Sequence, residues 1–257
     1  MNRIPDFKNK VILITGASRG LGSAFARFFA EAGATVVITA RRLEKLKDLS
    51  GELNKSSRGE VIPYQLDLTN PDEIETVLAS LVKEVGPVSV LINNAGITVE
   101  KENFMAHTLE DWQKVIDTNL TATWLMTQKI AKTMIEHKID GSIINVSSIA
   151  GTRAHMQSSP AYGASKAAMN HLTRALACEL GQWNIRINTL APGGIITNES
   201  TWQEESFAQK LVEKIPIRRY GNLEDLREAI YYLAGDGSAY MTGGILQVDG
   251  GLCASQL

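Results

Sequence analysis

Seven short apolar runs recur along this chain of 257 residues, and patterns typical of helices separate most of them. Strands that alternate with helices form a parallel sheet, because each right-handed crossover carries the chain back and packs its helix on one face. We therefore expect an α/β fold, doubly wound, with helices on both faces of a seven-stranded, mostly parallel sheet. The expected strands span residues 11–14, 35–39, 61–66, 88–92, 142–146, 185–190 and 245–248.

No linker or shift in composition divides the chain, so we expect a single domain over residues 1–257. A long helical stretch covers about residues 109–137 and is expected to break near Asn119. The segment 198–215 is polar, lies between a PGG turn and Pro216, and contains a short amphipathic fragment. We expect this segment to be an inserted flap.

Composition argues against several classes of protein. A formal net charge of −2 provides no basic surface for nucleic acid, and the sequence has neither an apolar signal core at its start nor a run long enough to span a membrane. The two cysteines, Cys178 and Cys253, lack the spacing of a disulfide framework or a zinc site, so we expect no metal. The expectation is a cytoplasmic protein that binds neither nucleic acid nor membrane.

Three glycines, Gly16, Gly20 and Gly22, directly follow the first expected strand and lead into a helical pattern. Glycine suits a position where the backbone takes a positive φ or where a side chain would block the approach of a ligand. The GxxxGxG spacing fits an ordinary strand-to-helix turn, and it equally fits a turn whose bare N–H groups bind a pyrophosphate. The glycines alone do not choose between these interpretations.

Further motifs follow the glycine turn in a definite order. They are Asp67 in QLDLTN, NNAG at 93–96, Ser148 in NVSSIAG, YGASK at 162–166 and PGGIIT at 192–197. This ordered set resembles the classical short-chain dehydrogenase/reductase family, and the resemblance covers essentially the whole chain. It implies a Rossmann-type fold and an oxidoreductase that acts on CH–OH groups with a nicotinamide cofactor as donor or acceptor.

Tyr162 and Lys166 lie four residues apart, and therefore on one face of a helix whose start is marked by Ser159 and Pro160. An unperturbed tyrosine has a pKa of about 10, and a nearby lysine cation and the helix N-terminus favour its phenolate form. Such a tyrosine can act as a general acid or base. The spacing is common on ordinary helices, and it is the other motifs that favour the catalytic interpretation.

The resemblance implies roles for four catalytic residues. Tyr162 exchanges a proton with the carbonyl or alcohol oxygen while hydride passes between nicotinamide and carbon. Ser148 holds that oxygen, and we choose it over Ser147 because Ile-Ala-Gly follows it; only one of two adjacent strand residues can face the site. Lys166 lowers the tyrosine pKa and binds the nicotinamide ribose. Asn119 bends its helix and holds a water in the proton path, unless it is a helix break alone.

The end of the second expected strand carries the signal for cofactor choice. Enzymes of this design that use NAD usually place an acidic residue there, whereas this chain has Ala40 followed by Arg41 and Arg42, with Arg19 in the glycine turn. Guanidinium groups match phosphate geometry, so we predict NADP(H). The alternative is that Arg41 and Arg42 are the polar start of a lysine-rich helix.

The resemblance also implies which residues line the cofactor. Asp67 meets the adenine amino group, Asn93 and Gly96 line the adenosine ribose, and Ile195 and Thr197 contact the carboxamide and pyrophosphate. The full expected set is Gly16, Ser18, Arg19, Gly20, Leu21, Gly22, Arg41, Arg42, Asp67, Leu68, Asn93, Ala95, Gly96, Tyr162, Lys166, Pro192, Gly193, Ile195 and Thr197.

Substrate contacts are expected from Ser148 and Tyr162, joined by Arg153, His155 and Trp202. Arg153 and His155 follow the serine motif and belong at the rim of the pocket, where both can equally be plain surface residues. Trp202 on the flap either closes over substrate and excludes water or is buried against a partner subunit.

The predicted reaction converts a ketone to a secondary alcohol or the reverse, and two specific activities stay open. One is reduction of a 3-oxoacyl thioester on acyl carrier protein or CoA, and the other is reduction of a keto-sugar acid, as in a gluconate 5-dehydrogenase. Relatives that act on carrier protein often have arginine in an LARE stretch, where this chain reads LACE with Cys178.

A protein of another class also stays open, one that binds NADP without turnover. The resemblance further implies a homo-oligomer, a dimer or homotetramer paired through the fifth and sixth helices. The apolar stripe of the expected helix 161–180 is compatible with this pairing, although any core helix shows such a stripe.

Overall fold

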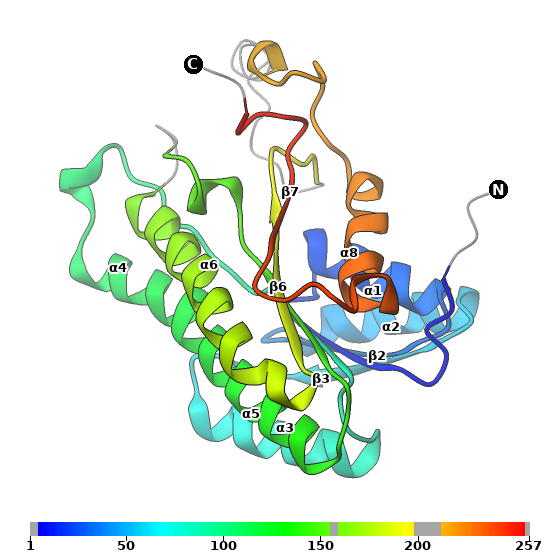
Figure 1. The fold of residues 1–257 in the computed structure, drawn as a ribbon. Helices are drawn as coiled ribbons and strands as arrows, with labels where there is room; N and C mark the ends of the chain where they lie inside the picture. The colour runs from blue at the N-terminus through cyan, green and yellow to red at the C-terminus, as the bar shows by residue number, and fades with distance from the viewer. Residues whose placement is uncertain (1–4, 155–158, 198–211, 255–257) are drawn as a thin grey trace.

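The computed structural model describes residues 5–154, 159–197 and 212–254 (Figure 1). Seven strands form one sheet in the order β3-β2-β1-β4-β5-β6-β7, and every neighbouring pair is parallel. This confirms the expected doubly wound α/β fold. The strands are β1 (Val11–Thr15), β2 (Thr35–Ala40), β3 (Glu60–Gln65), β4 (Val90–Asn93), β5 (Ser142–Val146), β6 (Arg186–Pro192) and β7 (Ile245–Val248).

Two strands show how pairing sets their limits. β6 continues beyond its expected end because Pro192 pairs with Val248 of β7, and the next N–H, that of Gly193, donates to the Val248 carbonyl at 2.9 Å. β3 contains Pro63, which has no N–H to donate. The proline is tolerated because β3 is the edge strand of the sheet.

Three helices cover one face of the sheet: α1 (Gly20–Glu31), α2 (Leu43–Ser56) and α8 (Arg227–Ala234). They form the right-hand layer in Figure 1. The core on this side is aromatic, since Phe28 and Phe29 of α1 are almost fully buried and the Phe29 ring lies 5.4 Å from that of Tyr231 on α8. The Tyr231 hydroxyl donates to the Phe28 carbonyl at 2.6 Å, so this buried polar group is satisfied.

The opposite face is covered by α3 (Pro71–Glu84), α5 (Ala122–Glu136) and α6 (Pro160–Leu180), with α4 (Leu109–Ile116) packed on α6. Their buried residues recur at helical spacing, as in Met126, Ile130 and Met134 of α5, and pack against the strands. Short helical turns complete the described structure: η1 (Phe104–Ala106), η2 (Asp117–Thr121), η3 (Ile149–Gly151), η4 (Gly181–Trp183), η5 (Leu223–Leu226) and η6 (Asp236–Ser238).

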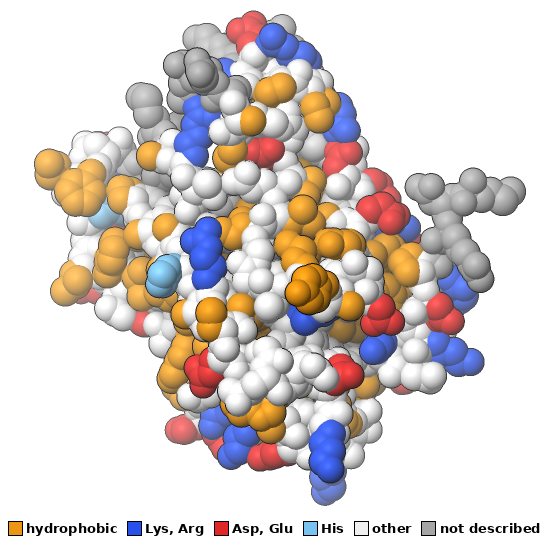
Figure 2. Space-filling model, in the orientation of Figure 1, with side chains coloured by type: hydrophobic (Ala, Val, Ile, Leu, Met, Phe, Trp, Pro, Cys, Tyr) orange, Lys and Arg blue, Asp and Glu red, His pale blue; other side chains and the backbone are white. Residues whose placement is uncertain are grey.

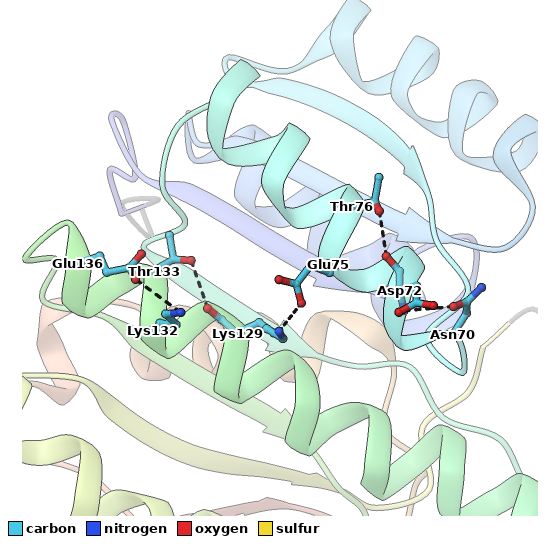
Figure 3. Close-up of polar contacts among 8 residues, drawn as sticks. All are labelled: Asn70, Asp72, Glu75, Thr76, Lys129, Lys132, Thr133 and Glu136. Atoms are coloured by element: carbon cyan, nitrogen blue, oxygen red, sulfur yellow. Dashed lines mark hydrogen bonds and ion pairs between the residues drawn. The ribbon is translucent and has the colours of Figure 1, made fainter.

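The outer surfaces of α3 and α5 are joined by charged side chains (Figure 3). Asn70 caps α3 by accepting hydrogen bonds from the N–H groups of Asp72 and Glu73 at 3.2 and 3.3 Å. One turn further along, Glu75 pairs with Lys129 of α5. This pair orients two helices that lie on the same face of the sheet.

The predicted break near Asn119 is confirmed, because α4 passes into α5 through a π-helical turn, η2. A π turn adds one residue per turn and is often found at functional sites. Asn119 lies inside it and is fully buried.

The strand order changes direction at the centre of the sheet, and in folds of this kind a crevice opens there at the carboxyl ends of the strands. β1 lies between β2 and β4, so the chain winds away from β1 in opposite directions on its two sides. Ligands of doubly wound folds bind outside the carboxyl ends of the strands at this point. The glycine turn follows β1 and the NNAG segment follows β4, so both motifs lie at the crevice.

Among the helices that the structure describes, none combines the length and the apolar character that crossing a bilayer requires.

Candidate active site

The turn between β1 and α1 owes its shape to three glycines. Gly16 has a φ of +65°, and a Cβ there would lie 2.7 Å from the Cα atom of Ala95. A Cβ on Gly22 would lie 2.6 Å from the Gly16 carbonyl oxygen, so both glycines are required by the packing of the turn itself. Gly20 differs, because it has a φ of +55° but a Cβ there would meet nothing within 4 Å. Open space therefore lies beside Gly20, at the start of α1.

Two residues that the sequence analysis did not single out, Thr15 and Asn94, hold this turn in place. The Thr15 hydroxyl accepts hydrogen bonds from the N–H groups of Asn94 and Ala95 at 3.0 and 3.1 Å. The Asn94 side chain donates to the carbonyls of Thr15 and Gly16 at 2.9 and 3.2 Å. The glycine turn and the NNAG segment are thus one hydrogen-bonded unit.

The start of α1 fits an anionic group. The helix follows Arg19 and has no acidic residue in its first turn. No carboxylate of that turn therefore neutralises the positive end of the helix dipole. The N–H groups of the first turn have no partner within the helix, and the open space beside Gly20 adjoins them. Ser18 is half-buried in the turn, and Leu21 packs against the aromatic core. A pyrophosphate fits this cradle.

Arg41 and Arg42 are exposed between β2 and α2. Asp67 follows β3, the neighbouring strand, and its carboxylate accepts from the N–H and hydroxyl of Thr69 at 2.9 and 2.7 Å. These bonds, with a smaller contribution from the Arg41 charge, hold the pKa of Asp67 below its usual value although burial opposes this. Leu68 packs against the core. Cations and a charged carboxylate therefore share this end of the crevice.

The side chain of Asn93 points into the fold. It is 2% exposed, and its amide donates to Thr127 and Asn145 at 3.0 and 2.9 Å, within the layer between sheet and helices. Side chains of successive strand residues point to opposite faces of the sheet, and that of Asn93 points toward the face covered by α5. That Asn93 and Gly96 line the adenosine ribose stays a prediction: the side chain of Asn93 has its partners inside the fold, and Gly96 lies exposed after β4.

Tyr162 lies in the first turn of α6, which begins at Pro160 after Ser159, as predicted. The side chain of Ser148 lies close enough to the Tyr162 hydroxyl to lower its pKa. Ser148 precedes η3, and its oxygen also accepts from the N–H of Ala150 at 3.1 Å. The two hydroxyl groups therefore meet at one point beside the crevice.

Ser147 faces away from Tyr162. It is 5% exposed, and its hydroxyl donates to the Lys166 carbonyl at 3.2 Å, which ties the end of β5 to α6. Of the two adjacent serines, the structure brings only Ser148 to the tyrosine hydroxyl.

Burial raises the pKa of Tyr162, and the hydrogen bond with Ser148 opposes this rise. The sequence suggested that the lysine and the helix N-terminus would favour the phenolate. In the protein alone desolvation has the larger effect, so the phenol keeps its proton.

Lys166 is buried beneath the crevice. Its Nζ lies 5.6 Å from the centre of the Tyr162 ring and donates to the carbonyl of Val146 at 2.8 Å. A Cβ on Gly96 would lie 3.3 Å from this Nζ, so a larger residue would crowd the lysine. Burial lowers the pKa of Lys166 to about 8. The amine can therefore change charge near neutral pH.

Asn119 does more than break a helix. Its amide donates to the carbonyl of Ile97 at 2.9 Å and to the Ser165 hydroxyl at 3.1 Å, and its oxygen accepts from the Ile97 N–H at 2.8 Å. The side chain thus joins the π turn to the segment after β4 and to α6, which carries the tyrosine and the lysine. A Cβ on Gly96 would lie 3.5 Å from the Asn119 side-chain oxygen as well as 3.3 Å from Lys166 Nζ, so Asn119 and Lys166 border the same point.

The PGG motif continues β6 into a loop at the crevice. A Cβ on Gly193 would lie 2.7 Å from the Cα atom of Asp249, so glycine is required for this approach. The next residues pair with Gly221, whose N–H donates to the Gly194 carbonyl at 2.9 Å and whose carbonyl accepts from Ile196 N–H at 2.8 Å. Gly221 carries no sequence motif and was not predicted.

Arg153 is half-buried, and its guanidinium donates to the carbonyl of Leu252 at 2.6 Å. It therefore links the serine loop to the C-terminal turn, a contact that no sequence motif predicts. Two other predicted substrate residues, His155 and Trp202, lie outside the described residues, as does most of the expected flap at 198–215.

Comparisons with known proteins point to one family. A family model described as enoyl-(acyl carrier protein) reductase matches residues 16–253. The 3-oxoacyl-[acyl-carrier-protein] reductase of Thermotoga maritima is 38% identical over 245 residues, which are 95% of this chain and 98% of that protein.

Solved structures share the fold over nearly the whole chain. A short-chain type dehydrogenase/reductase from Mycobacterium marinum is 36% identical with a TM-score of 0.89, and the match covers 96% of each chain. A structure described as an NAD(P)-dependent gluconate 5-dehydrogenase from Beutenbergia cavernae, with NADP bound at low occupancy, is 30% identical with a TM-score of 0.91, covering 97% of this chain and 99% of that one. The protein that brings Ser148, Tyr162 and Lys166 together at this crevice is an oxidoreductase of the short-chain dehydrogenase/reductase family.

Proposed function

We propose that the protein is an NADP(H)-dependent oxidoreductase that transfers hydride between the nicotinamide and a ketone or secondary alcohol. The observation that carries this proposal is the position of Lys166, whose buried amine lies 5.6 Å from the centre of the Tyr162 ring, with the Ser148 side chain near the tyrosine hydroxyl. Two hydroxyl groups converge where a substrate oxygen can be held, and one of them can supply a proton.

The residues of the chain account for the proton transfer. A bound nicotinamide supplies the hydride in reduction and accepts it in oxidation. Ser148 donates a hydrogen bond to the substrate oxygen, and Tyr162 gives that oxygen its proton as the carbonyl becomes an alcohol. The ammonium of Lys166 stabilises the phenolate that is left behind.

Burial keeps the Tyr162 phenol protonated, which is the form that acts as the acid in reduction. A phenol that keeps its proton is ready to protonate a carbonyl oxygen. Asn119 positions this set by joining the π turn to α6, and we propose that it also holds a water in the proton path.

NADP(H) rather than NAD(H) is favoured by charge. Arg41 and Arg42 are exposed where an acidic residue would bind the ribose of NAD, and Arg19 precedes α1. Guanidinium groups bind a 2′-phosphate through paired hydrogen bonds. The Beutenbergia structure, which shares the fold, contains NADP.

For the substrate we propose a 3-oxoacyl thioester, because the Thermotoga relative is a 3-oxoacyl-[acyl-carrier-protein] reductase. A keto-sugar acid is the second candidate, supported by the Beutenbergia structure. Cys178, which stands where carrier-protein enzymes often have arginine, is exposed on α6, and the missing cation weighs against a carrier-protein substrate. The segment 198–215 is proposed as the substrate flap.

We also propose a homo-oligomer, a dimer or tetramer, in the cytoplasm. Figure 2 shows hydrophobic side chains gathered on the side where α4 lies, and the exposed apolar residues of η1 and α4 include Met105 and Leu109 at 86% and 78% exposure. Large exposed apolar patches commonly mark protein interfaces. A second copy of the chain would cover this surface.

The test is NADPH consumption with a panel of carbonyl compounds: 3-oxoacyl-CoA and 3-oxoacyl carrier-protein thioesters, keto-sugar acids, cyclic diketones and ketosteroids. Turnover of one class, faster with NADPH than with NADH, supports the proposal and identifies the substrate class. NADPH binding without oxidation by any compound would favour a protein that binds NADP without turnover.

A further inference from the structure

The loop after the PGG motif pairs through its backbone with Gly221. Residues 194–196 bond to Gly221 through two hydrogen bonds of 2.9 and 2.8 Å, and Ile195 forms a parallel bridge with the same glycine. A cavity of about 140 Å³ adjoins this loop and is lined by Gly194, Ile195, Ile215, Arg219, Gly221, Asp225 and other residues. The pairing with Gly221 is therefore one of the contacts that set the position of the loop.

Gly221 is in turn fixed by an ion pair. Arg219 makes a two-pronged contact with Asp225, at 2.6 and 2.8 Å, and also donates to the Tyr220 carbonyl at 2.9 Å. The same carboxylate accepts from the N–H of Asn222 at 2.8 Å, so it binds on both sides of Gly221 along the chain. The short segment 219–225 is closed into a rigid loop around Asp225.

Asp225 lies in a turn that is attached to the buried core. It lies in η5, beside Leu226, and η5 leads directly into α8, where Ile230 is buried; both apolar residues are fully inaccessible to solvent. An exposed ion pair adds little to the stability of a protein. A bidentate arginine–carboxylate contact nevertheless holds its two side chains in a defined geometry. The chain of contacts thus runs from the core through Asp225 to Arg219, Gly221 and the loop.

We propose that Arg219 is a positioning residue for the nicotinamide end of the cofactor. This inference rests on the proposed function, in which Ile195 and Thr197 contact the carboxamide and the pyrophosphate. Arg219 acts through Asp225 and Gly221 and touches neither substrate nor cofactor. Without the ion pair, the 194–196 loop can move toward the cavity, and the nicotinamide loses a defined partner while the adenosine half of the site keeps its own.

The experiment compares two ligands on the full chain: NADPH and 2′-phospho-ADP-ribose, which lacks the nicotinamide. Arg219→Met should weaken NADPH binding roughly three- to tenfold, as expected for the loss of one charge-assisted contact network, and leave 2′-phospho-ADP-ribose binding unchanged. Arg219→Lys, which cannot form the two-pronged contact, should fall between parent and Arg219→Met. The matched control is Arg27→Met, which removes a surface ion pair with Glu52 on α1 and α2 and should alter neither affinity.

A second variant tests the same loop without touching the ion pair. A Cβ on Gly221 would lie 2.5 Å from the terminal Cδ1 atom of Ile195, so Gly221→Ala should displace this side chain, the proposed carboxamide contact, and reproduce the ligand pattern of Arg219→Met. Thermal unfolding of each variant confirms that it is folded.

Equal weakening of both ligands by Arg219→Met, or of neither, would overturn the inference and leave the proposed function intact. If the unaltered protein binds 2′-phospho-ADP-ribose but not NADPH, or binds neither, the proposed function fails, and the inference fails with it.

Discussion

The Nζ atom of Lys166 lies 5.6 Å from the centre of the Tyr162 ring and is held there by the carbonyl of Val146, at 2.8 Å. The partner that fixes the amine is a backbone group at the end of β5, so its position does not depend on the charge it carries. A neutral amine can keep the same hydrogen bond. Proton loss from Lys166 therefore changes the electrostatics at the tyrosine without requiring a change of geometry.

Lys166 should impose a pH dependence on stability. Burial lowers its pKa to about 8, so between about pH 8 and 10 the unfolded chain binds more protons than the folded protein. The free energy of unfolding should gain a rising contribution over this window. Urea unfolding at several pH values measures it, and Lys166→Met should remove it.

The quantity to compare is the difference in slope between parent and Lys166→Met, because other groups titrate nearby. The raised pKa of Cys253, about 11, lowers stability over a higher range, and the raised pKa of Tyr162 acts above about 10. Equal slopes in both proteins would show that Lys166 is charged throughout.

Tyr162→Phe should lower kcat for NADPH-dependent reduction by roughly 10²- to 10⁴-fold, the usual contribution of a general acid. The ring still packs at the start of α6, so NADPH affinity should stay within about twofold of the parent value. Stopped-flow measurement of NADPH oxidation, alongside equilibrium binding, separates the two effects. Retained turnover would assign the proton to another group.

The adjacent serines provide a matched pair of variants. Ser148→Ala removes the hydroxyl that meets Tyr162 and should lower kcat by about 10²-fold or more. Ser147→Ala removes a buried bond to the Lys166 carbonyl and should cost about 1 kcal/mol of stability with little change in kcat. Kinetics and urea unfolding of both variants decide the assignment, and the reverse pattern would contradict it.

Two glycines of the first turn should respond differently to alanine. Gly16→Ala forces a Cβ to 2.7 Å from the backbone of Ala95 at positive φ and should destabilise the protein by roughly 1–3 kcal/mol or more. Gly20→Ala has the same backbone penalty but no clash, so we expect a loss of about 1 kcal/mol.

For Gly20→Ala the larger effect should be on ligand binding, because the new methyl group occupies the space proposed for the pyrophosphate. Thermal unfolding and NADPH titration of both variants make the comparison. A Gly20→Ala protein that binds NADPH as well as the parent would place the pyrophosphate elsewhere.

Replacing Arg41 and Arg42 together by serine should raise the KM for NADPH roughly 10- to 100-fold and leave that for NADH nearly unchanged, because each lost guanidinium removes a charge-assisted bond. Lys45→Ser, an exposed change in the first turn of α2, is the control. Equal effects on both cofactors would mean that the arginines do not meet a 2′-phosphate.

The fold could be predicted because strand–helix alternation implies a parallel sheet. The four proposed catalytic positions came from the resemblance to a known family, and the structure brings Tyr162 and Lys166 together as expected. The face of the sheet toward which a side chain points was harder to predict from the sequence. Asn93 and Asn94 are equivalent in sequence, and only the register of β4 decides that the first faces the core and the second holds the glycine turn.

Hydrogen bonds between residues far apart in the sequence could not be predicted for a similar reason. Thr15 lies 79 residues from its partner Asn94, and Gly221 has no motif around it. Nothing local marks either residue, because its role exists only once the strands and loops have come together.

The bonds from Thr15 and Asn94 that shape the glycine turn all form within the protein itself. The conformational entropy of that turn is therefore lost when the chain folds and not when a dinucleotide arrives. Binding at this end of the crevice should need little backbone rearrangement, and its entropy cost should fall chiefly on the ligand.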